Sequence, residues 1–234
     1  GTGRFESLYC PESEVIYFDR SEVPVSSTSL RFDVYANWQY IPPICRPYYV
    51  KRVLIAGGES TGKSTLVQNL SIAYNTNFVR EIGRDTCDIA GGEDFMNMDD
   101  LCENFLKQKT EEIEAAYSSN RILFIDTDAV TTKFYSHFLL KKKEEIQKCD
   151  ALADAVSGIN RFDLVLFLEP TVSFVQDGTR NEKIAQDREK YSREIKMLFD
   201  EAGMEYCCLG GDYLDRFNQA KKLIEEKFHI KTIW

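Results

Sequence analysis

The segment Gly57-Gly58-Glu59-Ser60-Thr61-Gly62-Lys63-Ser64 constrains this chain more than any other feature. It matches the phosphate-binding pattern GxxxxGK[ST] in full. A β-branched apolar run over residues 50–56 precedes it, and residues 65–70 follow it with apolar residues at helical spacing. In this context, backbone N–H groups at a helix start can surround a phosphate chain. A glycine turn that only opens a helix is the alternative, and the flanking elements favour phosphate binding.

The phosphate-binding pattern also predicts roles for single residues. Lys63 is expected to reach the β- and γ-phosphates, and Ser64 is expected to bind Mg²⁺. ATP and Mg²⁺ are therefore the expected cofactors, and no motif distinguishes ATP from GTP. The expected phosphate-binding residues are Gly57, Gly58, Glu59, Ser60, Thr61, Gly62, Lys63, Ser64 and Thr65.

Composition narrows the class of protein. The 234 residues carry a net charge of −9, which argues against a general binder of nucleic acid or anionic membranes. We find neither an apolar run of the ~20 residues that a transmembrane helix needs nor a signal-peptide pattern at the start. Seven cysteines without a CxxC pair are typical of free thiols in a reducing compartment. We expect a cytoplasmic protein without zinc, and the sequence leaves open whether it forms a homo-oligomer.

From residue 50 onward, apolar strands alternate with helices. This order predicts a parallel sheet covered on both faces. The expected fold class is α/β: a three-layer P-loop NTPase sandwich with a central parallel sheet, like nucleoside and nucleotide kinases, with a lid. The expected strands are 51–56, 77–80, 121–126, 163–168 and 204–209, and the expected helices are 63–74, 99–117, 131–140, 184–202 and 214–228.

Residues 1–49 differ from residues 50–234, and we expect the two parts to be separate units. The first part holds most of the prolines and is rich in aromatic residues. It is too short to bury a core of its own. Within it, residues 14–18 could form a strand, and residues 26–28 could open a helix.

The second chemical signal is Asp126-Thr127-Asp128, at the end of a buried strand. A carboxylate at the carboxyl end of a strand beside the loop can hold Mg²⁺ or accept a proton from an attacking hydroxyl. The alternative for Asp128 is that it caps the next helix. We expect at least one of the two aspartates to be functional, and the sequence does not divide the roles between them.

Two further segments carry polar residues where a kinase would use them. Glu81 and Arg84 follow the second strand, where a carboxylate can bind sugar hydroxyls and an arginine can bind phosphate. Residues 176–180 contain Gly178 and Arg180, and Arg188 lies on the apolar stripe of the helix that follows. We expect this segment to be a lid that brings positive charge to the transferring phosphoryl group. The alternative in both places is a solvated turn.

In order, these motifs resemble the ribosylnicotinamide kinase domain of NadR-type bifunctional proteins. The resemblance covers residues 50–228 and includes Arg80-Glu81-x-x-Arg84, Asp177-Gly178-x-Arg180 and the block 213–218. It implies a transfer of phosphate from ATP to the 5′-hydroxyl of nicotinamide riboside. The residues that it implies for catalysis are Lys63, Glu81, Asp126, Asp128, Arg180 and Arg188, with Ser64 and Asp126 on Mg²⁺. Those implied for the acceptor are Glu81, Arg84, Asp128 and Tyr135.

The resemblance extends into the first part of the chain. Residues 25–31 resemble the (I/V)SSTxxR motif that ends the adenylyltransferase domain of the same proteins. Residues 1–49 are therefore expected to be the C-terminal part of that domain and a linker. At the position of Arg80 the family often has an aromatic residue, and another residue, such as Tyr135 or Phe134, could supply the stacking on the pyridine ring instead.

Other functions remain open at this point. The chain could phosphorylate another nucleoside or small hydroxylated metabolite, since the fold does not choose the acceptor. It could also be a regulatory module that senses a nucleotide. Nucleotidyl transfer is disfavoured, because the HxGH-type loop of the adenylyltransferase does not occur in this sequence.

Overall fold

A computed structural model describes residues 12, 14, 24–176 and 181–233 of the chain. By its internal contacts the chain divides into two compact units, residues 1–41 and 42–234. In the described part of the first unit, α2 (Ser27–Phe32) begins at Ser26. The Ser26 hydroxyl accepts from the backbone N–H of Ser29 at 3.1 Å, and the Ser29 hydroxyl accepts from Ser26 N at 3.0 Å. This capping box explains the helix start that the sequence predicts.

The rest of the first unit bears little on the site. After α2 comes the short 3₁₀ helix η1 (Trp38–Tyr40). The strand predicted for residues 14–18 lies, apart from residue 14, outside the described residues.

The second unit is built on a five-stranded parallel sheet in the order β2-β3-β1-β4-β5. The register places Ile55 of β1 beside Asp126 of β3 and Leu166 of β4. Strands β2 and β3 lie on one side of β1, and β4 and β5 lie on the other. In a parallel sheet, the point where the strand order reverses in this way has a crevice at the carboxyl ends of the strands, where ligands bind. The strands are β1 (Lys51–Gly57), β2 (Phe78–Val79), β3 (Ile122–Asp126), β4 (Leu164–Leu168) and β5 (Cys207–Leu209).

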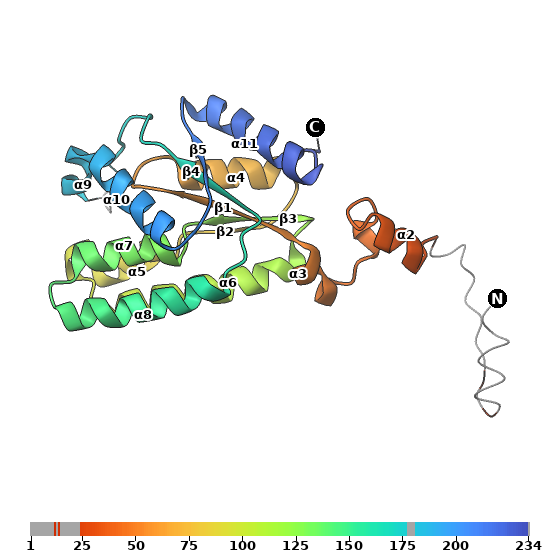
Figure 1. The fold of residues 1–234 in the computed structure, drawn as a ribbon, viewed down its shortest axis with the longest axis horizontal. Helices are drawn as coiled ribbons and strands as arrows, with labels where there is room; N and C mark the ends of the chain where they lie inside the picture. The colour runs from red at the N-terminus through yellow and green to blue at the C-terminus, as the bar shows by residue number, and fades with distance from the viewer. Residues whose placement is uncertain (1–11, 13, 15–23, 177–180, 234) are drawn as a thin grey trace. The chain divides into compact units, whose positions relative to one another are not determined.

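Helices cover both faces of this sheet, which makes the unit a three-layer sandwich (Figure 1). The described helices of this unit are α3 (Arg46–Tyr49), α4 (Lys63–Ala73), α5 (Gly83–Ala90), α6 (Met98–Ser118), α7 (Ala129–Leu139), α8 (Lys143–Ile159), α9 (Glu182–Gln186), α10 (Arg188–Glu201) and α11 (Tyr213–Phe228), with the 3₁₀ turns η2 (Pro43–Cys45) and η3 (Glu93–Phe95). Helices α4 and α11 lie on one face, and α6, α7 and α8 on the other. The predicted α/β sandwich is confirmed.

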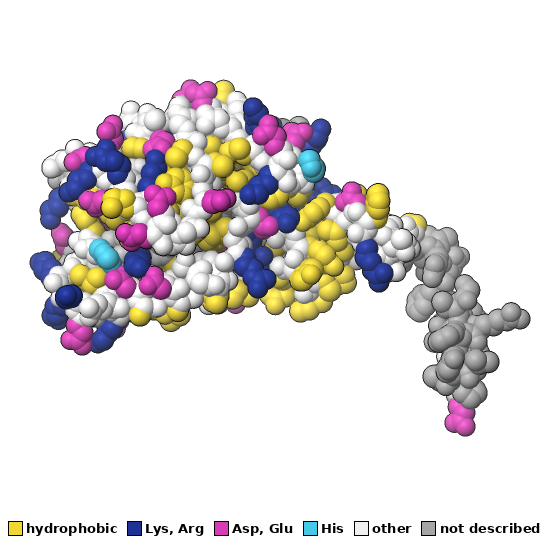
Figure 2. All heavy atoms as spheres, viewed as in Figure 1, with side chains coloured by type: hydrophobic (Ala, Val, Ile, Leu, Met, Phe, Trp, Pro, Cys, Tyr) yellow, Lys and Arg dark blue, Asp and Glu magenta, His cyan; other side chains and the backbone are white. Residues whose placement is uncertain are grey.

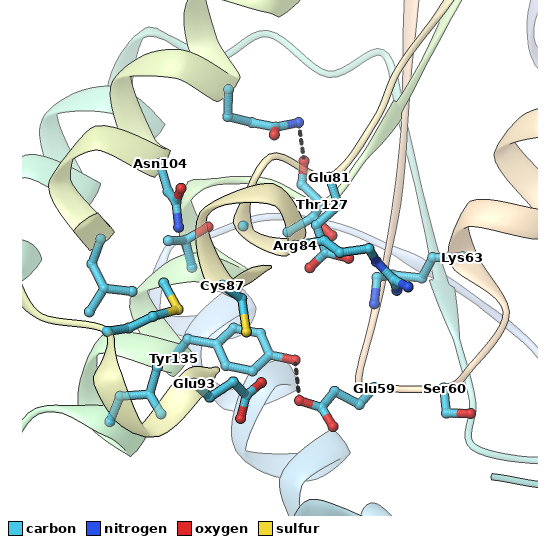
Figure 3. Close-up of a pocket in the computed structure, with 16 residues that line it drawn as sticks. Glu59, Ser60, Lys63, Glu81, Arg84, Cys87, Glu93, Asn104, Thr127 and Tyr135 are labelled. Atoms are coloured by element: carbon cyan, nitrogen blue, oxygen red, sulfur yellow. Dashed lines mark hydrogen bonds between the residues drawn. The ribbon is translucent and has the colours of Figure 1, made fainter. Parts of the chain in front are cut away.

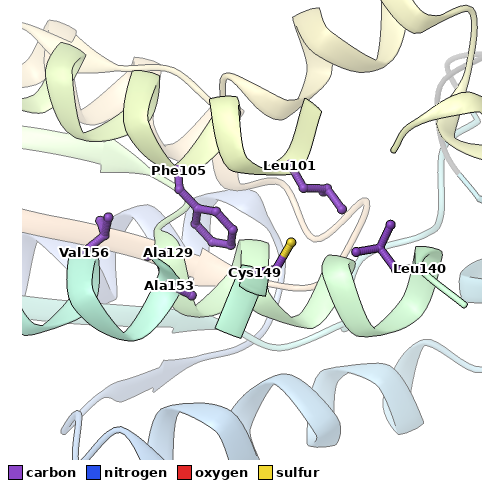
Figure 4. Packing of buried hydrophobic residues seen from close by; sticks show 7 residues of the cluster. All are labelled: Leu101, Phe105, Ala129, Leu140, Cys149, Ala153 and Val156. Atoms are coloured by element: carbon purple, nitrogen blue, oxygen red, sulfur yellow. The ribbon is translucent and has the colours of Figure 1, made fainter. Parts of the chain in front are cut away.

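A buried apolar cluster joins α6, α7 and α8 beneath the sheet (Figure 4). Phe105 of α6 is 1% exposed and packs there with Ala129, Cys149 and Ala153. Burying such side chains stabilises a fold by roughly 1.5–3 kcal/mol each for the larger ones. The cluster therefore holds α6 and α7 in fixed positions, and both helices carry residues of the site.

The helices differ from the expected ones in two respects. The helix expected over 184–202 is two helices, because Asp187 leaves helical geometry (φ −143°) and caps α10 through the backbone N–H of Lys190. Helices α5 and α8 were not predicted.

The two units divide at residues 41 and 42, and residues 42–49 pack with the second unit, where the Pro47 carbonyl accepts from Arg52 at 3.3 Å.

Charged side chains of both signs are interspersed on the face seen in Figure 2. On that face, lysines and arginines alternate with aspartates and glutamates over the second unit, and they do not gather into one basic stripe. Within the described residues, no helix has the length and apolarity required to cross a membrane.

Candidate active site

The phosphate-binding loop joins β1 to α4 and has the geometry that its glycines predict. Gly57 and Gly62 have φ values of +137° and +87°, which side chains rarely tolerate. The ammonium group of Lys63 is nearly buried and donates to the Gly58 carbonyl oxygen at 3.1 Å, and the Thr61 hydroxyl donates to the same oxygen at 2.8 Å. Lys63 therefore lies folded over the loop at the start of α4.

Asp126 ends β3, next to β1, and its carboxyl group is buried. Burial, and then the charge of Glu81, raises the pKa of Asp126 to about 6, against the opposing effects of Lys63, Ser64 and Thr127. The Ser64 hydroxyl lies close enough to this carboxyl group to oppose the rise in its pKa. The loop and the strand end thus place one hydroxyl and one carboxyl group near each other.

Gln108 of α6 fixes the ends of β2 and β3 relative to each other. Its amide nitrogen donates to the carbonyl oxygens of Asp126 at 3.1 Å and Thr127 at 3.4 Å. Its amide oxygen accepts from the backbone N–H of Ile82 at 3.1 Å. One side chain therefore connects the segment that carries Glu81 to the strand that carries Asp126.

A pocket extends from Lys63 between α5, α6 and α7 (Figure 3). Of the residues expected to bind an acceptor, Glu81, Arg84 and Tyr135 line it. The wall also includes side chains that the sequence did not single out, such as Cys87, Glu93, Asn104, Gln108 and Leu139. The pocket thus begins at the phosphate-binding loop and ends among aromatic, apolar and acidic side chains.

Glu59 of the loop and Glu93 of η3 form an acidic pair at the edge of this pocket (Figure 3). Their carboxyl groups lie within hydrogen-bonding reach of each other. Burial, and then the charge of Glu93, raises the pKa of Glu59 to about 8. Asn181 contacts both carboxylates, with its backbone N–H on Glu59 at 3.1 Å and its amide on Glu93 at 2.9 Å. The Tyr135 hydroxyl points to Glu59 at 3.5 Å.

The segment after β4 contacts the loop from the other side. The backbone N–H of Val175 donates to the Ser60 hydroxyl at 2.8 Å. Arg188 donates to the carbonyl oxygens of Ser60 at 3.0 Å and Val172 at 2.7 Å, and its guanidinium lies 5.7 Å from the Phe174 ring centre. The inward position predicted for Arg188 thus brings it to the phosphate-binding loop, where it donates to carbonyl oxygens. Arg180 lies outside the described residues.

Asp128 has the capping role that the sequence left as the alternative. It is the N-cap of α7, and its carboxylate accepts from the backbone N–H groups of Val130 at 3.2 Å and Thr131 at 3.0 Å. The Thr131 hydroxyl also donates to it at 2.9 Å. Among the described residues Asp128 is not part of the lining of the Lys63–Tyr135 pocket, and the catalytic and acceptor-binding role expected of it stays a prediction.

The two aromatic candidates for stacking have different surroundings in the structure. Tyr135 lines the pocket, and burial followed by the charge of Glu59 raises its pKa well above the usual value, so its hydroxyl stays protonated. Phe134 is buried instead in an aromatic cluster with Phe138 and Tyr191, with ring centres 6.0 Å from both. Only Tyr135 of these two is placed for a ligand.

Sequence reasoning missed Glu93, Asn104, Gln108 and Asn181. Glu93 follows Gly91 and Gly92, whose φ values of +87° and +129° mark a sharp turn, so the glycine pair was a usable signal. Asn104 and Gln108 lie on one face of α6 at a spacing of four residues and are polar where a core helix is usually apolar. Nothing near Asn181 in the sequence indicated its role.

Comparison with known proteins agrees with this geometry. The AAA domain family matches residues 52–216. The trifunctional NAD biosynthesis/regulator protein NadR of Salmonella typhimurium is 32% identical over 220 residues, which are 92% of this chain and 52% of that protein. The chain therefore spans about half the length of the curated relatives it matches.

Two solved structures resemble the whole fold. A NadR protein in complex with NR has a TM-score of 0.81 and 25% identity, and the match covers 100% of this chain and 69% of that one. A NadR protein in complex with NAD and AMP-PNP has a TM-score of 0.76 and 26% identity, over 93% of this chain and 60% of that one. The chain belongs to the AAA domain family and is homologous to NadR over the span that they share.

Proposed function

We propose that this chain is a ribosylnicotinamide kinase, which transfers the γ-phosphoryl group of ATP to the 5′-hydroxyl of nicotinamide riboside and gives nicotinamide mononucleotide. The observation that carries the proposal is the continuity of the pocket with Lys63, because phosphoryl transfer needs a phosphate donor and an acceptor in line. The homologous NadR structures, one with NR and one with AMP-PNP, support the same pair of substrates.

In this proposal the loop backbone and Lys63 hold the β- and γ-phosphates. The ammonium group would leave the Gly58 carbonyl for the phosphate oxygens. Arg188 is bound to the Ser60 carbonyl and would add positive charge beside the same loop. Arg180, outside the described residues, is proposed to close over the transferring group. Most of the rate enhancement would come from positioning and charge stabilisation.

Ser64 and Asp126 fit a magnesium ion. A hydroxyl oxygen and a carboxylate close to each other are the hard oxygen donors that Mg²⁺ takes, and Mg²⁺ uses few protein ligands when phosphates supply the rest. When bound, the ion neutralises charge on the phosphate oxygens. Among the described residues, no group of three or more acidic, histidine or cysteine side chains could hold a metal.

Glu81, Arg84 and Tyr135 are proposed to bind the acceptor. Glu81 lines the pocket and lies near enough to Asp126 to raise the pKa of that residue, so it borders both the acceptor and the phosphates. We therefore assign to Glu81 the orientation and deprotonation of the 5′-hydroxyl. Tyr135 is assigned to the nicotinamide ring, at the far end of the pocket from Lys63 (Figure 3).

For residues 1–49 we propose the C-terminal part of an adenylyltransferase domain with a linker. The α2 capping box at Ser26 and Ser29 supports this, because it builds the serine-rich helix start that such a phosphate-binding motif requires. In this proposal, the Ser and Arg side chains of residues 25–31 act together with the remainder of an adenylyltransferase domain.

The experiment is an incubation of the chain with ATP, Mg²⁺ and nicotinamide riboside in which ADP and nicotinamide mononucleotide are followed together. Other nucleosides run in parallel, and Lys63→Ala is the blank. We expect product with nicotinamide riboside and none with the variant. Product with another nucleoside alone would change the acceptor. Tight ATP binding without any product would instead favour a nucleotide-sensing module.

A further inference from the structure

The acceptor pocket has an uneven charge along its length. Its basic lining residues are Lys63 and Arg84, and its acidic lining residues are Glu59, Glu81 and Glu93. In Figure 3, Lys63 lies at one side, whereas Glu93 and Tyr135 lie at the other, with Glu59 below and between them. The end away from the phosphate-binding lysine is therefore the acidic end.

Within residues 24–176 and 181–233, the donors hydrogen-bonded to the Glu59–Glu93 pair are neutral. They are the backbone N–H and the amide of Asn181 and the hydroxyl of Tyr135. Neutral donors do not balance the negative charge that the two neighbouring carboxyl groups share in this partly buried place. A ligand that brings a positive charge to this end of the pocket would balance it.

The position of the reacting hydroxyl determines which part of an acceptor lies next to Glu59 and Glu93. The 5′-hydroxyl of a nucleoside must approach the phosphate held by Lys63. The ribose then lies beside Glu81 and Arg84, and the ring attached to C1′ is directed toward Tyr135 and Glu93.

We propose that Glu59 and Glu93 make the acceptor pocket selective for nucleosides whose ring carries a permanent positive charge. The inference rests on the proposed kinase function and specifies the substrate class of the same site. The pyridinium ring of nicotinamide riboside is such a cation. Its reduced form has the same ribose and carboxamide but an uncharged dihydropyridine ring, so it provides a neutral probe of nearly the same shape.

The test compares kcat/KM for oxidised and reduced nicotinamide riboside in the parent, Glu59→Gln and Glu93→Gln. We expect the parent to prefer the oxidised form by about tenfold or more, because a unit charge close to a carboxylate in a partly buried site interacts strongly. Each glutamine variant should reduce that ratio about threefold to tenfold. Since the ratio is taken within one protein, loss of folded material does not change it.

Asp94→Asn is the matched control, because Asp94 is an exposed neighbour of Glu93 outside the pocket lining, and its ratio should equal that of the parent. Equal kcat/KM for both forms in the parent would overturn the inference and leave the kinase function standing. An unchanged ratio in both glutamine variants would overturn it as well. If the parent phosphorylates neither form, the kinase function fails and the inference fails with it.

Discussion

The guanidinium group of Arg216 donates to the backbone carbonyl of Thr61, so α11 is hydrogen-bonded directly to the phosphate-binding loop. Its second terminal nitrogen donates to the Glu169 carbonyl at 2.7 Å and to the Thr171 hydroxyl at 2.8 Å. The side chain is 1% exposed. One planar cation thus fixes the loop relative to the end of β4, which a lysine could not do with the same geometry.

We expect Arg216→Lys to raise the KM for ATP about tenfold and to change the KM for the acceptor much less, since the loop loses a support and the pocket does not. The lost hydrogen bonds should also lower the free energy of unfolding by about 2 kcal/mol. Steady-state kinetics with each substrate varied in turn, and urea unfolding, measure both effects. Lys222→Ala, on the exposed side of the same helix, is the control. Equal increases in both KM values would contradict a role confined to the loop.

The position of Asp128 leads to a prediction that separates capping from catalysis. Asp128→Ala should lower the free energy of unfolding by about 1–2 kcal/mol, because two N–H groups at the start of α7 lose their acceptor. Asp128→Asn keeps an oxygen acceptor and should be nearly as stable as the parent. Both variants should keep kcat within a few-fold, measured at a temperature where they remain folded. A well-folded Asp128→Asn protein with kcat reduced about 100-fold would instead identify a proton-transfer role.

Hydrophobic pattern and loop chemistry predicted the part of the molecule that local rules control. The strands that hold Ala56 and Asp126 are nearly continuous apolar runs, and Gly62 and Lys63 mark the loop between strand and helix. Each of these features depends on a few neighbouring residues, so a single sequence contains the information. The predicted order of the motifs then places the loop and Asp126 together, because parallel strands end at one edge of the sheet.

The rest of the site depends on contacts between distant segments. Glu93 and Asn181 are 88 positions apart, and a hydrogen bond from the Asn181 amide to the Glu93 carboxylate joins them in the folded chain. Helix α8 was missed because its first turn is a charged run around Lys143, which is typical of a solvated segment. The buried side chains of the helix begin only at Cys149. At Asp187 a short capping side chain breaks a pattern that reads as one continuous helix.

Stability should depend on pH through Glu59. Its folded-state pKa of about 8 lies above its ordinary value of 4.5, so the folded protein holds a proton that the unfolded chain has released between these pH values. Its carboxylate therefore destabilises the fold increasingly as pH rises from about 5 to 8. Glu59→Gln should match the parent at pH 5 and be more stable by roughly 1–3 kcal/mol at pH 8.5, with allowance for partial exposure.

Urea unfolding of the protein without ligands at pH 5 and at pH 8.5 measures this difference. Asp94→Asn again provides the comparison, as an acid next to Glu93 that is open to solvent. A Glu59→Gln protein with the same advantage at both pH values would attribute the effect to packing and not to the carboxylate charge.

Gly62 gives a prediction about the contact between the loop and α11. A Cβ atom at this position would lie 2.8 Å from Cε1 of the Tyr213 ring, and the φ of +87° disfavours any side chain. Gly62→Ala should therefore lower the free energy of unfolding through two separate effects, the dihedral cost of about 1–2 kcal/mol and the steric contact. In the Gly62→Ala background, Tyr213→Ala removes the steric contact and leaves the dihedral cost. The free energies of unfolding of the parent, both single variants and the double variant form a cycle, in which the double variant should be more stable than the sum of the single effects predicts. Strict additivity would mean that the ring moves away freely and does not constrain the loop.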